Sequence, residues 1–289
     1  MSLSSAPRHI RLTTSGKDLD RCDVVLGGKI PKENPNPNIL HTIQTGITEA
    51  IFGLYFHFDA PLVQNEKFRK ALSPAINRQE LFSDEENLSL THTMIPRQFR
   101  KKKYLFPEPE YNPQKARMLF KEMIQQYNVS KLIVPDRNPT ASPWKQKLER
   151  HLNDLGLPVE FQYGKNIANY DSQTKTMIPF SVLGFIPSVF TAAPIFKVFQ
   201  SGGGWVSRLP EKDHLYDDLV SKGLQLPIEE QDGSVIKLQH RFLEKVYALP
   251  LYETKLLFFS NPKTIKTLHP EKQNLSFRMK LVEPLKTPN

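Results

Sequence analysis

Three consecutive glycines, Gly202, Gly203 and Gly204, form the segment that most invites a phosphate-binding loop. Such a loop needs a lysine followed by serine or threonine, because the lysine pairs with the phosphates and the hydroxyl binds magnesium. Trp205 and Val206 follow the glycines instead. We therefore interpret the glycines as a flexible turn before Trp205.

Metal chemistry would need histidines, cysteines or carboxylates at ligand spacing. The eight histidines are isolated from one another, and Cys22 is the only cysteine, which excludes an internal disulfide and a multi-cysteine zinc site. His240 and Glu244 are four residues apart on a predicted helix, but a metal needs at least one further ligand. We interpret them as a solvated pair, and the sequence predicts no metal site.

Catalytic residue patterns are also missing from the sequence. It contains no Gly-x-Ser-x-Gly nucleophile elbow, and Cys22 has no recognisable catalytic setting. The acids at 217–218 and 229–230 are adjacent, so the two side chains of each pair point apart on a helix. The sequence therefore predicts no catalytic residue and no cofactor, and we interpret the chain as not being an enzyme.

The formal net charge of +9 raises the possibility of a nucleic-acid partner. The sharpest basic run, residues 97–104, interleaves arginines and lysines with aromatic residues. It stands beside a proline-rich segment at 107–109, and we interpret it as a solvated loop. The remaining lysines are scattered among acids and form no stripe. Nucleic-acid binding is therefore the less favoured alternative, and no nucleic acid is expected as a partner.

Length and composition describe a folded globular protein. The 289 residues suffice for one large domain or two modest ones. Hydrophobic residues make up 39% of the chain and charged residues 24%, which argues against disorder. No run of about 18 apolar residues occurs, so we expect no membrane span. Residues 1–9 are polar, so we expect no export signal in the chain as given.

The first predicted helical block covers residues 65–82. Asn65 can cap its start, and apolar side chains follow at three-four spacing. Pro74 lies inside this pattern, so we expect a kink there or a division into two pieces. Asn77 with Glu80 three residues later would open the second piece.

Two further helices begin with a cap residue followed by proline. Residues 112–113 open a helix over 113–127, and residues 142–143 open one over 143–155. Strands predicted at 132–134 and 159–163 flank the second of these helices. This order predicts an α/β fold that contains a parallel pair of strands.

Several segments stand in a fixed order along the chain. Residues 53–57 read Gly-Leu-Tyr-Phe-His and are followed by the helical segment 63–78, and further such segments are 95–96, 111–119, 152–159, 216–220 and 248–252. In this order they resemble family 5 of the extracellular solute-binding proteins, the peptide-binding kind that feeds ABC transporters. Residues 53–57 resemble the family's glycine-leucine-x-phenylalanine-asparagine strand, with His57 in place of the asparagine, and residues 63–78 resemble the helix that follows this strand.

The resemblance implies the fold and the domain organisation. Family members have two lobes with a ligand enclosed between them. The fold would be α/β, a periplasmic-binding-protein-like type II lobe with a mixed sheet and flanking helices. Residues 1–44 would return from an incomplete first lobe, 45–245 would form the second, carboxyl-terminal lobe, and 246–289 would be strands returning to the first lobe. We also expect the three helices to pack on one sheet, and the strand at 249–259 to present an unpaired apolar edge.

The family's cleft segment, tryptophan-x-alanine-aspartate-tyrosine-x-aspartate-proline, corresponds to residues 184–190. Its acid binds the free amine of a peptide, but residues 176–200 contain no acid. Phe185 can replace the stacking tryptophan. The resemblance thus implies ligand binding by Phe185, Ile186 and Ser188, with His57 and Trp205 as weaker candidates. Amine capture would come from the missing lobe, or the ligand is not a free-amine peptide.

The function implied by the resemblance is that of the solute-binding component of an ABC transporter. It would act as a monomer in the periplasm or at the cell surface, with a peptide or related small solute as ligand and the permease membrane subunits as partners. The sequence also leaves open that the chain is a truncated or non-functional copy of such a protein. The alternative is a ligand-sensing domain of a regulatory protein with the same fold, which an upstream helix-turn-helix would favour.

Overall fold

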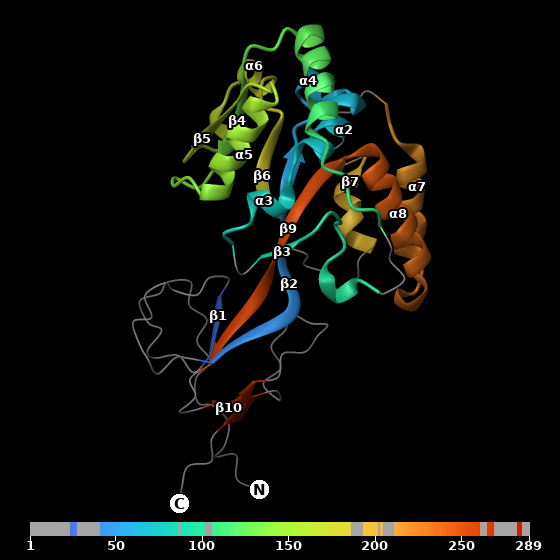
Figure 1. The fold of residues 1–289 in the computed structure, drawn as a ribbon. Helices are drawn as coiled ribbons and strands as arrows, with labels where there is room; N and C mark the ends of the chain where they lie inside the picture. Colours follow the sequence, from blue (N-terminus) through green and yellow to red (C-terminus); the bar gives the residue numbers. More distant parts are fainter. Residues whose placement is uncertain are drawn as a thin grey trace, which may run out of the picture. The chain divides into compact units, whose positions relative to one another are not determined.

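The structure is a computed structural model, and it describes residues 24–27, 41–85, 88–101, 106–185, 193–201, 203–204, 211–260, 265–268 and 282–284. The chain divides into two compact units (Figure 1). One comprises Met1–Ala50 with Thr254–Asn289, and the other comprises Ile51–Glu253. The domain boundaries expected from the sequence, at 44/45 and 245/246, stay a prediction.

The first unit contains short antiparallel ladders. Strand β1 (Val24–Gly27) pairs with the distal part of β9 (Ala248–Ser260), with Val24 opposite Ser260. Strand β10 (Ile265–Leu268) pairs with β11 (Val282–Pro284).

The largest sheet has the strand order β1-β9-β2-β6, and β3 (Leu88–Leu90) also pairs with β9. Strand β2 (His41–Phe56) runs antiparallel to β6 (Phe180–Phe185). A Cβ at Gly53 would collide with the backbone oxygen of Leu249, so glycine lets β2 and β9 approach closely here. Because β9 has β1 and β2 as neighbours, the expectation of an unpaired edge was wrong.

The predicted parallel unit is present. Strand β4 (Leu132–Asp136), helix α5 (Pro143–Asp154) and strand β5 (Val159–Tyr163) follow one another, and β4 and β5 pair in parallel. These two strands form a ladder of their own, although the Ile133 N–H donates to the Met177 oxygen at 3.0 Å, just before β6. The three predicted helices therefore do not share one continuous hydrogen-bonded sheet.

Asparagine caps start the helices where the sequence predicts them. Asn65 accepts a bond from Lys67 at the start of α2 (Glu66–Ala75), and Asn77 accepts one from Glu80 in α3 (Arg78–Leu81). Asn112 caps α4 (Pro113–Tyr127) in the same way. Pro74 lies in the last turn of α2, and the predicted block 65–82 is therefore two helices.

The second half of this unit carries a helical hairpin and several short elements. Figure 1 shows α7 (His214–Gln225) beside α8 (Asp232–Lys245). The short helices are α1 (Pro61–Gln64), α6 (Ser172–Lys175), η2 (Arg97–Phe99), η3 (Ile167–Asn169), η4 (Ala193–Val198) and η5 (Ile228–Glu230). The short strands β7 (Phe199–Gln200) and β8 (Gly203–Gly204) pair with each other.

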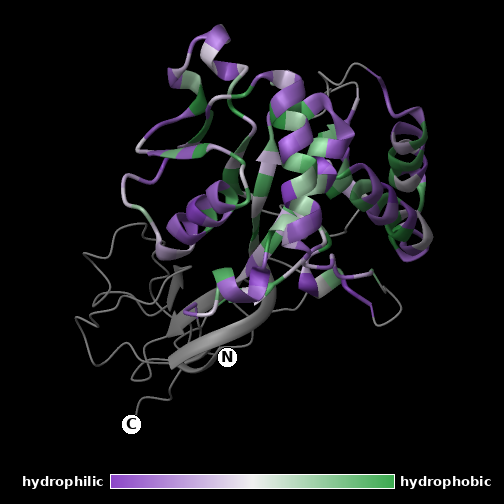
Figure 2. Cartoon of the chain, turned by 45° about the horizontal axis from the view of Figure 1, so that its top comes forward, coloured by the Kyte–Doolittle hydropathy of each residue, from purple (hydrophilic) through white to green (hydrophobic). Residues whose placement is uncertain are grey.

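One contiguous apolar core runs through the unit that spans 51–253. The helices are amphipathic, with hydrophilic residues along one side and hydrophobic residues along the other (Figure 2). Phe68 of α2 meets Phe120 of α4 with ring centroids 6.2 Å apart. Arg69 is buried beside them and donates to backbone oxygens of Val63, Gln64, Lys245 and Val246, so its charge is well solvated by carbonyl groups.

Among the described residues, no helix is long and apolar enough to cross a bilayer.

Candidate functional site

The structure describes two of the five predicted ligand-binding residues. Phe185 is the last residue of β6 and is half-buried, and His57 follows directly after β2. Ile186, Ser188 and Trp205 lie outside the described residues.

Phe185 and His57 do not lie together. The β2–β6 ladder runs from Ile51 opposite Phe185 to Phe56 opposite Phe180, so the two residues stand at opposite ends of it. With a rise of about 3.4 Å per residue, they are roughly 20 Å apart along the strands. One small solute would not touch both side chains.

His57 makes contacts that tie the two strands to each other. Its Nε2 lies 2.7 Å from Ser181 Oγ, and its backbone N–H donates to the Pro179 oxygen. Burial lowers the pKa of His57 to about 4, against the opposing effect of Asp59. The ring is therefore neutral near pH 7. Its role in ligand binding stays a prediction.

At the Phe185 end of the ladder, Phe52 packs over Gly184, the first residue of the cleft segment expected from the sequence. Phe52 is the ladder partner of Gly184, and a Cβ at Gly184 would lie 2.7 Å from the Phe52 ring. The ring stacks on Tyr252 of β9, with centroids 4.9 Å apart and an interplanar angle of 8°. A glycine before Phe185 thus leaves room for a stacked aromatic pair.

Two further rings extend this pair into an aromatic cluster, defined here as Phe52, Phe82, Trp144 and Tyr252. Tyr252 lies 4.8 Å from Phe82 and 5.6 Å from Trp144, and Phe82 lies 5.1 Å from Trp144. Trp144 belongs to the first turn of α5. The cluster therefore connects the end of β6 to the start of α5.

Beside Trp144 lies a buried ion pair that the sequence reasoning missed. Lys145 Nζ donates to Asp136 Oδ2 at 2.5 Å, and the two side chains are 11% and 5% exposed. Asp136 Oδ1 accepts the Asn138 N–H at 3.0 Å. Asp136 is the last residue of β4, so an acid at the carboxyl end of a buried strand was the available signal.

The basic run at 97–104 is not simply a solvated loop. Arg100 donates to Glu253 at 3.0 Å, and Arg97 lies 3.3 Å from the same carboxylate, which is 1% exposed. Arg100 also bonds Thr91 and the Ile95 oxygen. Residues 102–105 of the run lie outside the described residues.

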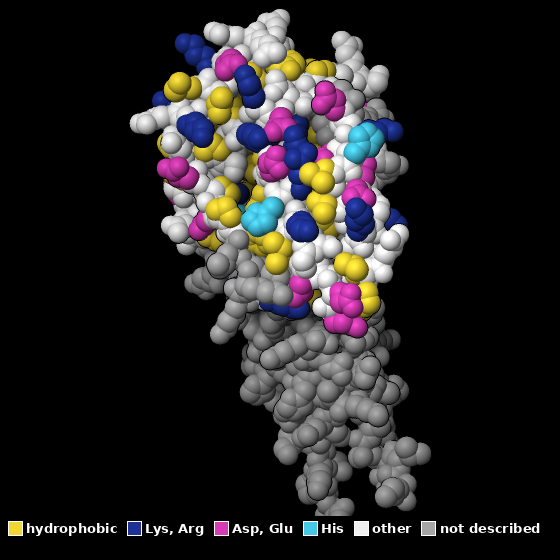
Figure 3. All heavy atoms as spheres, turned by 90° about the vertical axis from the view of Figure 1, so that its right-hand side faces the viewer, with side chains coloured by type: hydrophobic (Ala, Val, Ile, Leu, Met, Phe, Trp, Pro, Cys, Tyr) yellow, Lys and Arg dark blue, Asp and Glu magenta, His cyan; other side chains and the backbone are white. Residues whose placement is uncertain are grey.

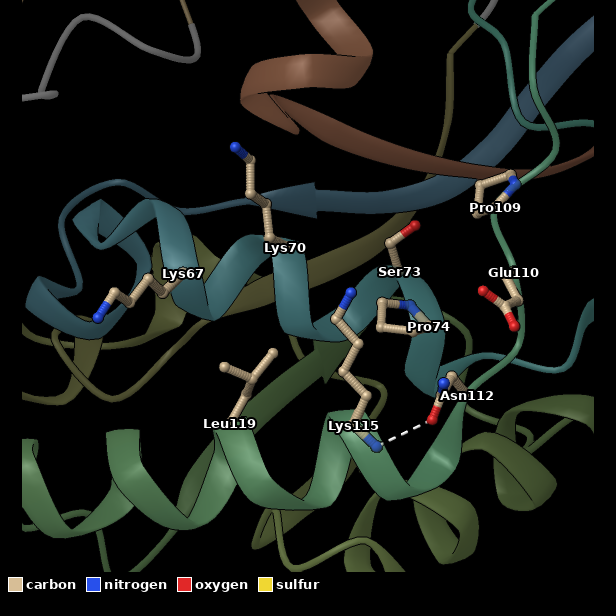
Figure 4. Close-up of a pocket in the computed structure, with 9 residues that line it drawn as sticks. All are labelled: Lys67, Lys70, Ser73, Pro74, Pro109, Glu110, Asn112, Lys115 and Leu119. Atoms are coloured by element: carbon tan, nitrogen blue, oxygen red, sulfur yellow. Dashed lines mark hydrogen bonds between the residues drawn. The ribbon is translucent and has the colours of Figure 1, made fainter.

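A hollow of about 420 Å³ lies between α2 and α4 (Figure 4). Three lysines line it, but Lys67 and Lys70 point away from each other and are paired with glutamates of their own. A binding site needs polar groups that converge on one point. We therefore do not place the candidate site in this hollow.

The described part of the chain gives no sign of a metal cluster, and the face drawn in Figure 3 shows no basic stripe. No group of three or more metal-binding side chains occurs within the described part of the chain. Figure 3 shows one face on which lysines and arginines alternate with acids and hydrophobic residues. A nucleic-acid interface would show a basic stripe instead.

The comparison with family models and the comparison with solved structures both find solute-binding proteins. The model of the bacterial extracellular solute-binding proteins, family 5, middle part, matches residues 15–207. Among curated proteins, none matches the sequence.

Three solved structures are similar to this chain. DppA of Helicobacter pylori, a periplasmic binding protein solved with the peptide STSA, has a TM-score of 0.69 and 16% identity over 92% of this chain and 53% of its own. NikA of Brucella suis, solved with Fe(III)-EDTA, has a TM-score of 0.68 and 12% identity over 92% and 58%. The oligopeptide-binding AppA of Bacillus subtilis, solved with a nonapeptide, has a TM-score of 0.66 and 13% identity over 92% and 57%.

The described chain therefore spans a little over half the length of each of these proteins. Similarity at such low identity concerns the fold. It confirms the α/β fold of a periplasmic-binding-protein-like lobe that the sequence predicted.

Proposed function

We propose, from the premise that this chain belongs to family 5 of the bacterial extracellular solute-binding proteins, that it binds a small solute for an ABC transporter. The observation that carries the proposal is the family match over residues 15–207, which includes β2, α2, the β4–α5–β5 unit and the end of β6. Binding of this kind is non-catalytic, and its partners would be the permease subunits of the membrane.

The proposed cleft lies at the edge where β4, β5 and β6 end. Ligands of α/β sheets commonly bind outside the carboxyl ends of the strands. In this proposal the cleft edge includes Phe185, the aromatic cluster and the Asp136–Lys145 pair. Aromatic walls with a few fixed polar groups are typical of small-molecule sites.

We propose a peptide or a related small solute as the ligand. The DppA and AppA structures hold peptides, and peptides offer apolar side chains to an aromatic wall. The proposed location is the periplasm or the cell surface, where proteins of this family act. Enclosure would follow from closure of two lobes around the ligand.

Calorimetric titration with a mixed library of tri- to pentapeptides tests this proposal. Because the chain spans little more than half of the matched structures, we expect weak binding, on the order of millimolar. The variant Phe185→Ala should weaken it further, and Met118→Ala, at an exposed position of α4, is the matched control. Micromolar binding that is lost in Phe185→Ala would instead make this lobe a complete receptor and overturn the account of the cleft. The absence of any binding signal would contradict the function itself.

A further inference from the structure

We propose that Asp136 is the anionic group of an ammonium-binding site that the chain's own Lys145 fills. A primary ammonium of the solute would exchange with Lys145 when it binds. This last step rests on the proposed function, but the existence of the site does not.

The first observation is the position of the pair. Asp136 ends β4 and Lys145 is in the first turn of α5, so both lie at the strand-end edge assigned to the cleft. The carboxylate is fixed from the other side by the Asn138 N–H at 3.0 Å. The acid is thus held by backbone, whereas its cation sits on a long flexible stem that can swing away.

The second observation is the chemistry of the walls. The Lys145 Nζ lies 5.5 Å from the centroid of the Trp144 ring, within the range of cation–π attraction. The Tyr252 ring packs edge-on against Trp144 at 5.6 Å. A carboxylate combined with aromatic faces is a suitable environment for an ammonium group.

The third observation is that Lys145 fits the site incompletely. An ammonium carries three N–H donors, and among the described residues Asp136 is its one hydrogen-bond acceptor. Nearby, the hydroxyls of Tyr163 and Ser142 are buried without a partner in the described part of the chain. Tyr163 is the ladder partner of Asp136, and Ser142 is the cap residue of α5 that makes no cap bond.

Tyr163 can serve as the additional acceptor. Burial, with the charges of Glu149 and Asp136, raises the pKa of Tyr163 to about 12, so its hydroxyl stays neutral. A free ammonium is not tethered to α5, so it can approach both the carboxylate and this hydroxyl. Buried hydroxyls without partners are uncommon and call for an explanation, and a bound ligand group would satisfy them.

Exchange of one ammonium for another preserves the charge balance of the site. Removal of the lysine alone would leave a buried carboxylate without its cation, which is strongly unfavourable. Lys145 should therefore leave only when another ammonium enters. Lys145 acts in this way as a built-in competitor that excludes solutes without a free ammonium.

The site is tested by replacing the lysine with a free ammonium. Lys145→Ala should be less stable than the unsubstituted chain, and methylammonium chloride should raise its melting temperature relative to sodium chloride of equal ionic strength. At about five times the dissociation constant the expected rise is about 3 °C. The neutral pair Asp136→Asn with Lys145→Met is the control and should show no such rise. If the two salts change the melting temperature of Lys145→Ala equally, the Asp136–Lys145 pair only holds α5 against β4, and the proposed ammonium site is wrong.

If Lys145→Ala does not fold, peptide binding to the unsubstituted chain still tests the proposal. Tri-alanine should bind more tightly than N-acetyl-tri-alanine, by about tenfold or more, because only the former offers an ammonium. The double variant should lose this preference. If both peptides bind equally, the exchange is wrong although the proposed function stands. If neither binds but methylammonium rescues Lys145→Ala, the site stands and the proposed function is overturned.

Discussion

Asp213 combines three stabilising contacts in one carboxylate. It caps α7 by accepting the Tyr216 N–H, it receives two bonds from Arg241 at 2.8 and 3.1 Å, and it accepts the Tyr247 hydroxyl at 2.6 Å. Burial would raise the pKa of Asp213, but the bonds from Arg241 and Tyr247 outweigh it and lower this pKa. The carboxylate therefore links α7, α8 and the start of β9.

We predict that Asp213→Asn lowers the free energy of unfolding by about 2 kcal/mol, because asparagine keeps the cap but loses the charge. A lowered carboxyl pKa gives stability that is present above the unfolded pKa and lost as the pH falls, here below about 4. Denaturant titrations at several pH values measure both effects. The control Asp218→Asn affects a half-exposed pair with Lys222 and should cost less than about 1 kcal/mol. A loss for Asp213→Asn that is unchanged at pH 2 to 3 would contradict this account.

His57 should also make stability depend on pH, here because burial disfavours its charged form. Its folded pKa of about 4 lies below the unfolded value of about 6.5, so the unfolded state binds the proton first. Stability should therefore decrease as the pH falls from about 6.5 to 4, by up to about 3 kcal/mol.

The variant His57→Asn should lack this decrease, as followed by denaturant unfolding across that pH window. His214→Asn, at an exposed position of α7, is the matched control. A pH profile of His57→Asn that coincides with that of the unsubstituted chain would show that His57 is not neutral when folded.

The candidate site was only partly accessible to sequence reasoning. Phe185 was predicted through its place in a motif, which is local information, and its role in ligand binding stays a prediction. Asp136 was missed because its partner Lys145 approaches it only after β4, the loop and α5 have folded. His57 was grouped with Phe185 although the antiparallel register separates them. Register depends on pairing between distant segments, and single motifs do not contain it.

At the scale of elements, helix starts and the local parallel pair of β4 and β5 were predictable, whereas strand partners distant in sequence were not. Asn112 and Pro113 specify the start of α4 by capping and fixed backbone geometry, so the predicted and observed bounds agree. Strand β9 looked like an unpaired edge, yet β1, some 230 residues earlier in sequence, pairs with it from Val24↔Ser260 to Gly27↔Leu257.

Gly184 is predicted to control the aromatic cluster. In Gly184→Ala the new Cβ would force the Phe52 ring away from Tyr252, at a cost of about 1–3 kcal/mol. Near-ultraviolet circular dichroism should show the loss of the stacked pair, and thermal unfolding should show the cost. Gly233→Ala, in α8 with no atom within 4 Å of the new Cβ, is the control and should be neutral or stabilising by about 0.5 kcal/mol. An unaltered aromatic spectrum for Gly184→Ala would disprove the arrangement of Phe52.

At the scale of the whole molecule, the unit that spans 51–253 has the features of an independently folding domain. It has one contiguous core, capped helices and a buried arginine, Arg69, that donates to several backbone oxygens and lies over the ring of Phe58. Its strand-end edge concentrates aromatic and charged groups, whereas the hollow between α2 and α4 does not. We therefore propose that edge as the place of solute binding.

The most direct test of this assignment is a nuclear magnetic resonance titration of the isotope-labelled chain with tri-alanine. We predict saturable shift changes in the millimolar range that are confined to the signals of Phe52, Tyr163, Phe185 and Tyr252 and of the first turn of α5, and that shrink in Phe185→Ala. The residues lining the hollow between α2 and α4 should not respond. Changes centred on that hollow, or none at the strand-end edge at saturation, would contradict the account.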